Sequence, residues 1–198
     1  MYFAGLKEKK QVVKNKLIAH STMPETQNIR LRALEPEDLS LLYTIENDTD
    51  IWDSSNADGP YSRYALKTYI ASSPTIRESG EQRFVIDTAS PNEKERNPIG
   101  IVDLTNYTPL DARAEVGIAF LKTYRNKGYG LQALKALETH ATQWLRIHAL
   151  YAHILKSNEI SIHLFENAGY KRVAELPNWH YKGGKYENIY VYMKFFST

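Results

Sequence analysis

The chain has 198 residues, of which 42% are hydrophobic and 24% are charged, and these proportions are those of a globular protein of one domain. It contains no cysteine, which excludes disulfides, thiolate metal sites and a cysteine nucleophile. Its net charge of +2 is uneven, with five lysines against two glutamates in residues 1–28 and 20 basic against 21 acidic residues elsewhere, so we expect no nucleic-acid partner.

The N-terminal segment is set apart by its lysines. It lacks the apolar core of a secretory signal, and no part of the chain has the run of about 18 apolar residues that a membrane helix needs. We therefore expect a basic extension over residues 1–27 and one domain over residues 28–198, with no membrane partner. The absence of cysteine favours a reducing compartment, the cytoplasm.

The first half of the domain is predicted to alternate between strands and helices. Glu35 and Pro36 open a helix, because proline fits a first turn and acids suit its N-terminus, and Leu39, Leu42 and Ile45 form its core face. The elements expected in chain order are a strand over 28–33, this helix, a polar loop over 47–60, a helix over 62–71 that Ser62 can cap, a loop over 72–80, and strands over 82–88, 98–106 and 113–121.

The second half begins with a long amphipathic helix. Apolar residues recur in steps of three and four from Leu131 to Leu145, which predicts a helix over residues 127–147. After it we expect a strand over 150–155, a short helix over 158–167 ended by Gly169, and strands over 171–175 and 186–195 with Gly183 and Gly184 between them. The complete order, β-α-α-β-β-β-α-β-α-β-β, indicates an α/β fold.

The turn before the long helix is the most informative stretch of the sequence. Residues 124–131 read Y-R-N-K-G-Y-G-L, a basic turn with two glycines between a strand and a helix. Such a turn can bind phosphate, because the first N–H groups of the helix are unpaired and the helix dipole favours negative charge. It lacks both the Walker and the dinucleotide patterns. A purely structural turn is the alternative interpretation of the motif.

Two motifs resemble those of the GNAT N-acetyltransferase superfamily. R-x-x-G-x-G at residues 125–130 resembles the acetyl-coenzyme A pyrophosphate loop. N-E-I-S-I-H-L-F-E-N-A-G-Y at 158–170 is similar to the family's N-x-x-(S/A)-x-x-(L/I)-Y-x-x-x-G-F segment. The element order also matches, so the resemblance implies the GNAT acyl-CoA N-acyltransferase fold, a mixed sheet of about seven strands flanked by about four helices.

Within the superfamily the sequence is most similar to spermidine N-acetyltransferases, through G-E-Q-R-F-V-I at 80–86, R-A-E at 113–115 and S-I-H at 161–163. Ribosomal-protein alanine acetyltransferases are nearly as similar. The resemblance implies an enzyme that transfers an acetyl group from acetyl-CoA to a primary amine, such as spermidine, by direct attack in a ternary complex. A protein N-terminus as the acceptor, and a non-catalytic acyl-CoA-binding module, are the alternatives. It implies no metal, and exposed edge strands favour a homodimer.

The resemblance also assigns residues to the cofactor. Backbone N–H groups of residues 126–131 should hold the pyrophosphate, and the pantetheine arm should pair with residues 116–120 like an added strand. Asn158 should bond the pantetheine or a phosphate, unless it only caps its helix. The expected cofactor-binding residues are Val116, Gly117, Ile118, Arg125, Asn126, Lys127, Gly128, Tyr129, Gly130, Leu131 and Asn158.

Glu115 is the expected catalytic base, because the fourth strand borders the acceptor site in this family. In a partly closed cleft its pKa should be raised towards neutrality. The alternative is a surface glutamate paired with Arg113. Tyr107, Asp103 and His163 are weaker candidates, and His140, His148 and His153 lack metal-ligand spacing.

Phe165 stands where many family members have a tyrosine that protonates the leaving thiolate. Phenylalanine has no proton to donate, so the resemblance does not say which group does this.

Acidic residues gather between the first two helices, in the region that roofs the acceptor cleft of this fold: Glu46, Asp48, Asp50, Asp53 and Asp58, with Trp52 among them. Carboxylates and an aromatic face suit a cationic amine, so Glu46, Trp52 and Asp53 are the expected acceptor-binding residues. The alternative is a solvated loop whose acids serve turns and caps.

Overall fold

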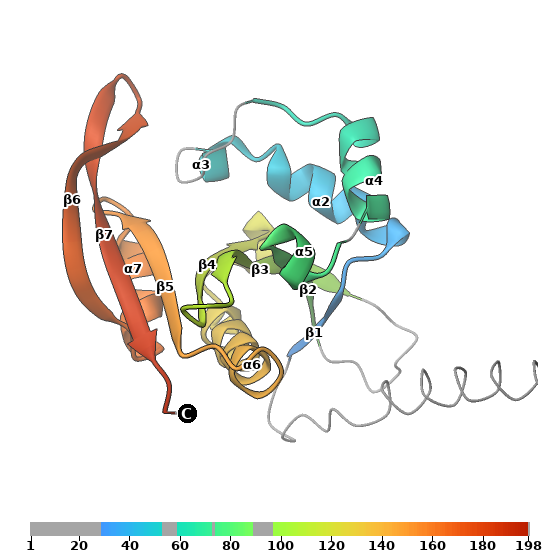
Figure 1. The fold of residues 1–198 in the computed structure, drawn as a ribbon. Helices are drawn as coiled ribbons and strands as arrows, with labels where there is room; N and C mark the ends of the chain where they lie inside the picture. Colours follow the sequence, from blue (N-terminus) through green and yellow to red (C-terminus); the bar gives the residue numbers. More distant parts are fainter. Residues whose placement is uncertain (1–28, 53–58, 73, 89–96, 198) are drawn as a thin grey trace, which may run out of the picture.

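The computed structural model describes residues 29–52, 59–72, 74–88 and 97–197 (Figure 1). The predicted extension over residues 1–27 lies outside them, and the division into extension and domain stays a prediction. Over the described residues seven strands form one sheet in the order β1-β2-β3-β4-β5-β7-β6. They are β1 (Ile29–Ala33), β2 (Gln82–Thr88), β3 (Pro98–Thr108), β4 (Arg113–Phe120), β5 (Ala149–Leu155), β6 (Lys171–Lys182) and β7 (Lys185–Phe195).

The described part of the chain has six α-helices, four of which have eight or more residues. These four are α2 (Leu39–Glu46), α4 (Arg63–Ser72), α6 (Tyr129–Gln143) and α7 (Glu159–Asn167). The expected α/β fold, with seven strands and four principal helices, is therefore confirmed. The predicted start of the first helix is a 3₁₀ turn, η1 (Pro36–Asp38), and a second such turn, η2 (Lys122–Tyr124), follows β4.

Two one-turn helices interrupt segments that the sequence predicted as loops. In α3 (Thr49–Trp52), the N–H groups of Ile51 and Trp52 donate to the carbonyl of Asp48. In α5 (Ile76–Ser79), Thr75 and Glu78 form a reciprocal capping box, and Gly80 ends the turn with a φ of 76°. The loop predictions were wrong here because local hydrogen bonds, which apolar periodicity does not report, close each turn.

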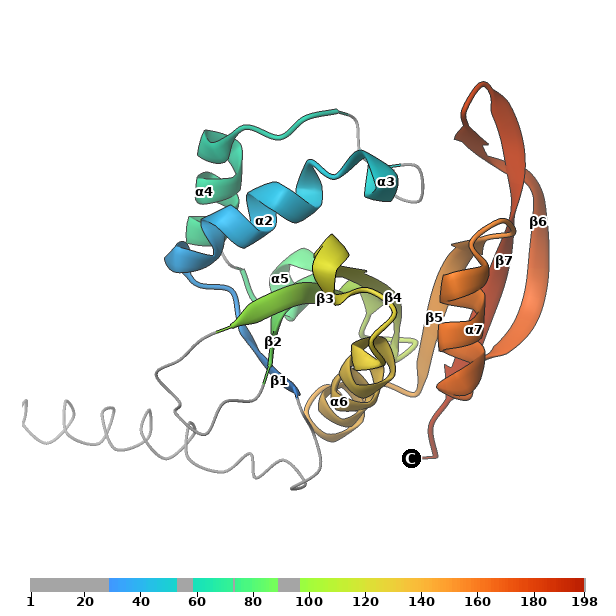
Figure 2. The same ribbon diagram turned by 180° about the vertical axis from the view of Figure 1, so that it is seen from behind.

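The sheet separates two apolar cores. Successive side chains of a strand face opposite sides, so Val102 and Leu104 of β3 pack with α6, whereas Ile101 packs with α2 and α4. Figures 1 and 2 show α6 on one face of the β1–β4 half and α2 with α4 on the other. We call the α2–α4 side the acceptor face. No helix in the described part is long and apolar enough to cross a bilayer.

Several predicted boundaries moved, and α6 ends at Gln143 rather than at residue 147. Helix α6 begins at Tyr129, because Gly128 has a φ of 80° and is its N-cap. Strand β6 runs past Pro177 to Lys182, although the sequence predicts an end at residue 175. It stays paired with β7 across a register shift between Leu176 and His180. Gly183 has a positive φ in the connection, as that turn requires.

The sheet opens between β4 and β5. All other neighbouring strands are antiparallel, but β4 and β5 are parallel and pair only over three positions, from Arg113 opposite Ala149 to Glu115 opposite Tyr151. Beyond Glu115 the strands separate, and Figure 1 shows β5, β7 and β6 turning away from β4. The β4 edge over residues 116–120 therefore has no strand partner on this side among the described residues. We call the point of separation the fork.

Candidate functional site

A cavity lies between the turn before α6, the end of β4 and the start of α7. It has a volume of about 710 Å³. All the predicted cofactor residues line it except Val116 and Gly117, which lie further along β4 towards the fork. One wall comes from Asp50 and Ile51 of α3, which the sequence did not associate with the cofactor.

The two glycines of the turn have different structural reasons. Gly128 has a φ of 80°, and a Cβ added to it would meet no atom within 4 Å, so the space beside it is open. A Cβ on Gly130 would lie 3.0 Å from Cδ2 of Leu164, because α6 and α7 pack closely there. Open space beside the missing Cβ is therefore present at Gly128 but not at Gly130, and the phosphate-binding role of the turn stays a prediction.

Asn158 lies at the cavity and also caps α7. Its Oδ1 accepts a hydrogen bond of 3.1 Å from the backbone N–H of Ser161. Both sequence interpretations of this residue are thus compatible with its position, because the side-chain NH₂ group is not used in the cap.

The guanidinium of Arg125 is already hydrogen-bonded within the protein at two of its nitrogens. Its Nε donates to the carbonyl of Phe120 at 3.0 Å, and its NH2 donates to Asp48 at 2.6 Å. Lys127, by contrast, lies 5.4 Å from the ring centre of Tyr124. The turn therefore has one cation tied to the segment after α2 and one stacked beside the cavity.

Glu115 lies at the fork on the acceptor face, since Ala114 and Val116 on either side of it are buried in the α6 core. Its carboxylate accepts hydrogen bonds from His153 Nδ1 at 2.7 Å and from Asn106 Nδ2 at 2.8 Å. Partial burial acts to raise the pKa of Glu115, but these two hydrogen bonds outweigh it and the pKa lies below its ordinary value.

Two expectations for Glu115 were wrong. Its pKa is lowered, not raised, because the cleft supplies donors for the charged carboxylate. Its partner is not Arg113, which instead pairs with Asp111 at 3.2 Å.

His153 is the residue that sequence reasoning missed. The hydrogen bond to Glu115 raises the pKa of His153 above its ordinary value of 6.5. The two residues are 38 positions apart, and the parallel register of β4 and β5 brings them together. Both strands were predicted from the sequence but their pairing was not, and the histidines were considered only for metal spacing.

Of the predicted acceptor-binding carboxylates, Glu46 is the one that the structure describes, and it is in an ion pair. Arg83 of β2 pairs with Glu46 of α2 and, through two hydrogen bonds of 2.8 and 2.7 Å, with Asp103 of β3. Trp52 donates from its indole nitrogen to the carbonyl of Glu46 at 2.6 Å. Two acids of the expected roof, Asp53 and Asp58, lie outside the described residues. The described acids of the expected roof, Glu46, Asp48 and Asp50, are thus in ion pairs, and acceptor binding by this region stays a prediction.

Phe165 lies in the core of the protein. Its exposed fraction is 3%, and its ring meets that of Tyr170 edge to face at 5.0 Å. It does not line the cavity.

We therefore expect Phe165→Tyr to lower the melting temperature without raising kcat, because a buried hydroxyl without a partner costs about 1–3 kcal/mol. Tyr170→Phe is the matched control, since its hydroxyl is already buried without a partner and its removal should be neutral or stabilising. A higher kcat in Phe165→Tyr at an unchanged melting temperature would show that the ring edge faces the reacting thioester.

Comparison with known proteins agrees with this architecture. The family model of the acetyltransferase (GNAT) domain matches residues 28–171. The spermidine N(1)-acetyltransferase of Escherichia coli K12 is 27% identical over 169 residues, covering 84% of this chain and 85% of that protein. The enzyme of the same name from Vibrio cholerae is 25% identical over 161 residues, covering 81% and 89%.

Solved structures show the same fold. The crystal structure of the Vibrio cholerae spermidine N-acetyltransferase in complex with CoA and spermine superposes with a TM-score of 0.76 at 23% identity, over 85% of this chain and 95% of that one. The fold and the matching family model are those of an acetyltransferase. The chain belongs to the GNAT acetyltransferase family, and the predicted acetyl-CoA-dependent N-acetyltransferase is confirmed at that level.

Proposed function

We propose that the protein transfers the acetyl group of acetyl-CoA to a primary amine of a polyamine such as spermidine, by direct attack in a ternary complex. The observation that carries the proposal is the fork, where an unpaired strand edge leads from the cavity to the Glu115–His153 pair. The named activity of the Escherichia coli and Vibrio cholerae relatives supports the polyamine as acceptor.

The cavity suits coenzyme A by its chemistry. Its wall includes the first residues of α6, whose N–H groups have no helical partners and favour an anion such as the diphosphate. The amide-rich pantetheine arm can pair with the free β4 edge from Phe120 towards Val116. This path ends at the fork, so the thioester would lie beside Glu115 and His153.

The pair at the fork supplies the base. The acceptor ammonium must lose a proton before its nitrogen can attack the thioester carbon, and neutral His153 can take that proton. Glu115 then stabilises the imidazolium that forms, as its hydrogen bond to Nδ1 permits. The C–S bond breaks, and the departing thiol has a pKa of about 8.5, so the thiolate can leave without a dedicated acid.

The acceptor face carries a net negative charge near the fork. Glu46 and Asp103 share one cation, Arg83, and Glu115 lies on the same face. A polyamine could therefore place a second ammonium near this cluster, where the negative charge attracts it and does not attract a neutral group. The charge excess is smaller than a free acidic roof would give.

The experiment that tests the proposal measures coenzyme A release with spermidine, spermine, small monoamines and peptides with free N-termini. We expect turnover with the polyamines. Turnover with peptides alone would support acetylation of a protein N-terminus, and tight coenzyme A binding without turnover of any amine would support a non-catalytic module.

A cytoplasmic location and self-association belong to the same proposal. A structure of the Vibrio cholerae relative is dodecameric, which supports an oligomer more directly than the sequence did. Light scattering of the purified protein would determine whether it is a homodimer, a larger assembly or a monomer.

The pH dependence of the reaction should reveal which residue is the base. If His153 is the base, kcat/KM rises with pH through the pKa of His153, which Glu115 holds above 6.5. Glu115→Gln removes the carboxylate, so we expect this rise to move to lower pH and the plateau to fall. If Glu115 itself were the base, its lowered pKa would leave it charged throughout the neutral range, and no rise near neutrality would be seen.

A further inference from the structure

We propose that Asp48 is a positioning residue, whose ion pair with Arg125 joins helix α3 to the cofactor turn and so couples acetyl-CoA binding to the ordering of the acceptor side. The acceptor named in one experiment below rests on the proposed function. The coupling itself does not, because coenzyme A alone is enough to test it.

Helix α3 forms part of the wall of the cavity. Helix α3 follows directly from α2 on the acceptor side, yet Asp50 and Ile51 of α3 line the cavity opposite the cofactor turn. No residue of α3 is fully buried, and its one core contact is Ile51, which packs partly buried against the α2–α4 core. Polar contacts at the start of α3 therefore add to what holds it at the cavity.

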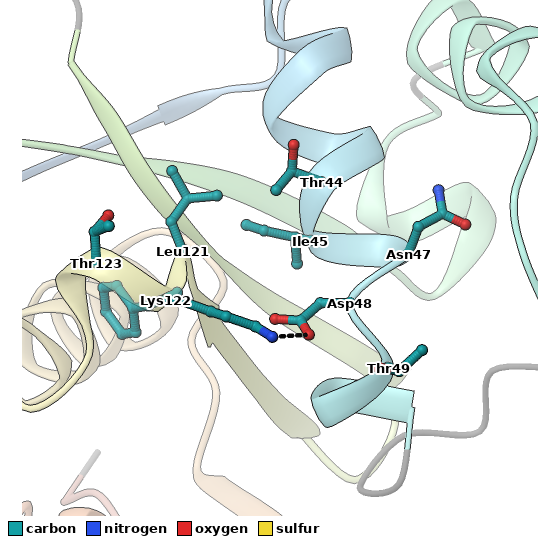
Figure 3. A pocket seen from close by; sticks show the side chains of 9 residues that line it. Thr44, Ile45, Asn47, Asp48, Thr49, Leu121, Lys122 and Thr123 are labelled. Carbon is teal, nitrogen blue, oxygen red and sulfur yellow. Dashed lines mark ion pairs between the residues drawn. The ribbon is translucent and has the colours of Figure 1, made fainter.

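A cluster of charged side chains lies at the start of α3. The side chain of Asp48 is only 8% exposed and accepts from Arg125 NH2 at 2.6 Å and from Lys122 Nζ at 3.2 Å. Figure 3 shows Lys122 reaching from the turn after β4 to this carboxylate beside a second cavity. Asp50 adds a pair with Lys122 at 3.0 Å. Two carboxylates of the acceptor side thus meet two cations of the cofactor side.

The three nitrogens of the Arg125 guanidinium have different partners. Arg125 uses Nε on the carbonyl of Phe120 and NH2 on Asp48, whereas NH1 has only a long contact of 3.6 Å with Asp50. A guanidinium has five N–H donors in a fixed plane, so NH1 can bind an anion in the cavity without release of Asp48. A diphosphate there would bind the same Arg125 guanidinium that pairs with Asp48 at the start of α3.

These contacts predict ordered binding. Coenzyme A fixes Arg125, Arg125 fixes Asp48, and the carbonyl of Asp48 accepts from the N–H groups of Ile51 and Trp52, which form α3. The acceptor then meets a wall that is already ordered. Coenzyme A should thus tighten acceptor binding, and by linkage the acceptor must tighten coenzyme A binding by the same factor.

The test uses hydrogen–deuterium exchange of the Ile51 and Trp52 amides with and without saturating coenzyme A. In the unaltered protein we expect slower exchange on binding, and in Asp48→Asn we expect no slowing at saturation. Asparagine retains the Oδ1 that accepts from the N–H of Asp50, so this variant removes charge rather than the local turn. Asp111→Asn, which breaks an exposed ion pair elsewhere, is the control and should behave like the unaltered protein.

A second variant and a second readout complete the design. Arg125→Lys keeps the charge but not the planar set of donors, so it should also lose the slowing at saturating coenzyme A. In the unaltered protein coenzyme A should tighten spermidine binding by about 5- to 150-fold, and this factor should approach one in both variants. Slowing of α3 that persists in Asp48→Asn, or is absent from the unaltered protein, would overturn the proposal, whether or not spermidine is the acceptor.

Discussion

His153→Ala is expected to lower kcat by about 10²- to 10⁴-fold while the affinity for coenzyme A is retained. The imidazole is the group at the fork whose protonation changes near neutral pH, and its removal leaves Glu115 without the partner that donates at 2.7 Å. Single-turnover kinetics with preformed acetyl-CoA complex would separate this loss from any change in cofactor binding.

His148→Ala is the matched control for that variant. His148 precedes the same strand, is exposed, and stacks against Phe195 at 5.6 Å, away from the fork. We expect nearly unchanged kcat in the control. A His153→Ala enzyme with the kcat of the unaltered protein would show that a water or another residue takes the proton.

Gly128→Val is expected to weaken coenzyme A binding severely while the protein still folds. Valine is strained at a φ of 80°, which costs about 1–3 kcal/mol, and its branches would occupy the open space beside the start of α6. Isothermal titration with coenzyme A and a melting curve of the same sample measure the two effects separately.

Gly183→Val is the control for backbone strain. Gly183 also has a positive φ, of 55°, and open space around its missing Cβ, but it lies in the β6–β7 turn. It should lose stability without loss of coenzyme A affinity. Equal affinity of Gly128→Val and the unaltered protein would mean that the cofactor turn is only structural.

Gly130→Val should behave differently from Gly128→Val. Its Cβ would press on Leu164 at 3.0 Å, so its main effect should be on the packing of α6 against α7 and on the melting temperature. The sequence pattern treats the two glycines alike, and only their surroundings distinguish a ligand-side position from a packing position.

The sequence by itself determined the order of the seven strands and the four principal helices, the position of the glycine turn before α6, and the family. These follow from local information, because apolar periodicity, cap residues and glycines act within a few positions of the chain. Asn158 illustrates this, since a helix cap was one of its two predicted roles and its side chain bonds the N–H of Ser161 as a cap should. The range 82–88 was likewise predicted as a strand and is β2.

The tertiary structure decided what each charged group does. The Glu115–His153 pair depends on the register of two parallel strands, and the Asp48–Arg125 pair joins residues 77 positions apart. Arg83 similarly pairs with Glu46 of α2 and Asp103 of β3, a contact that was not predicted from the sequence. A charge acts through its distance to other charges and its exposure to water, and the chain order fixes neither quantity until the sheet has formed.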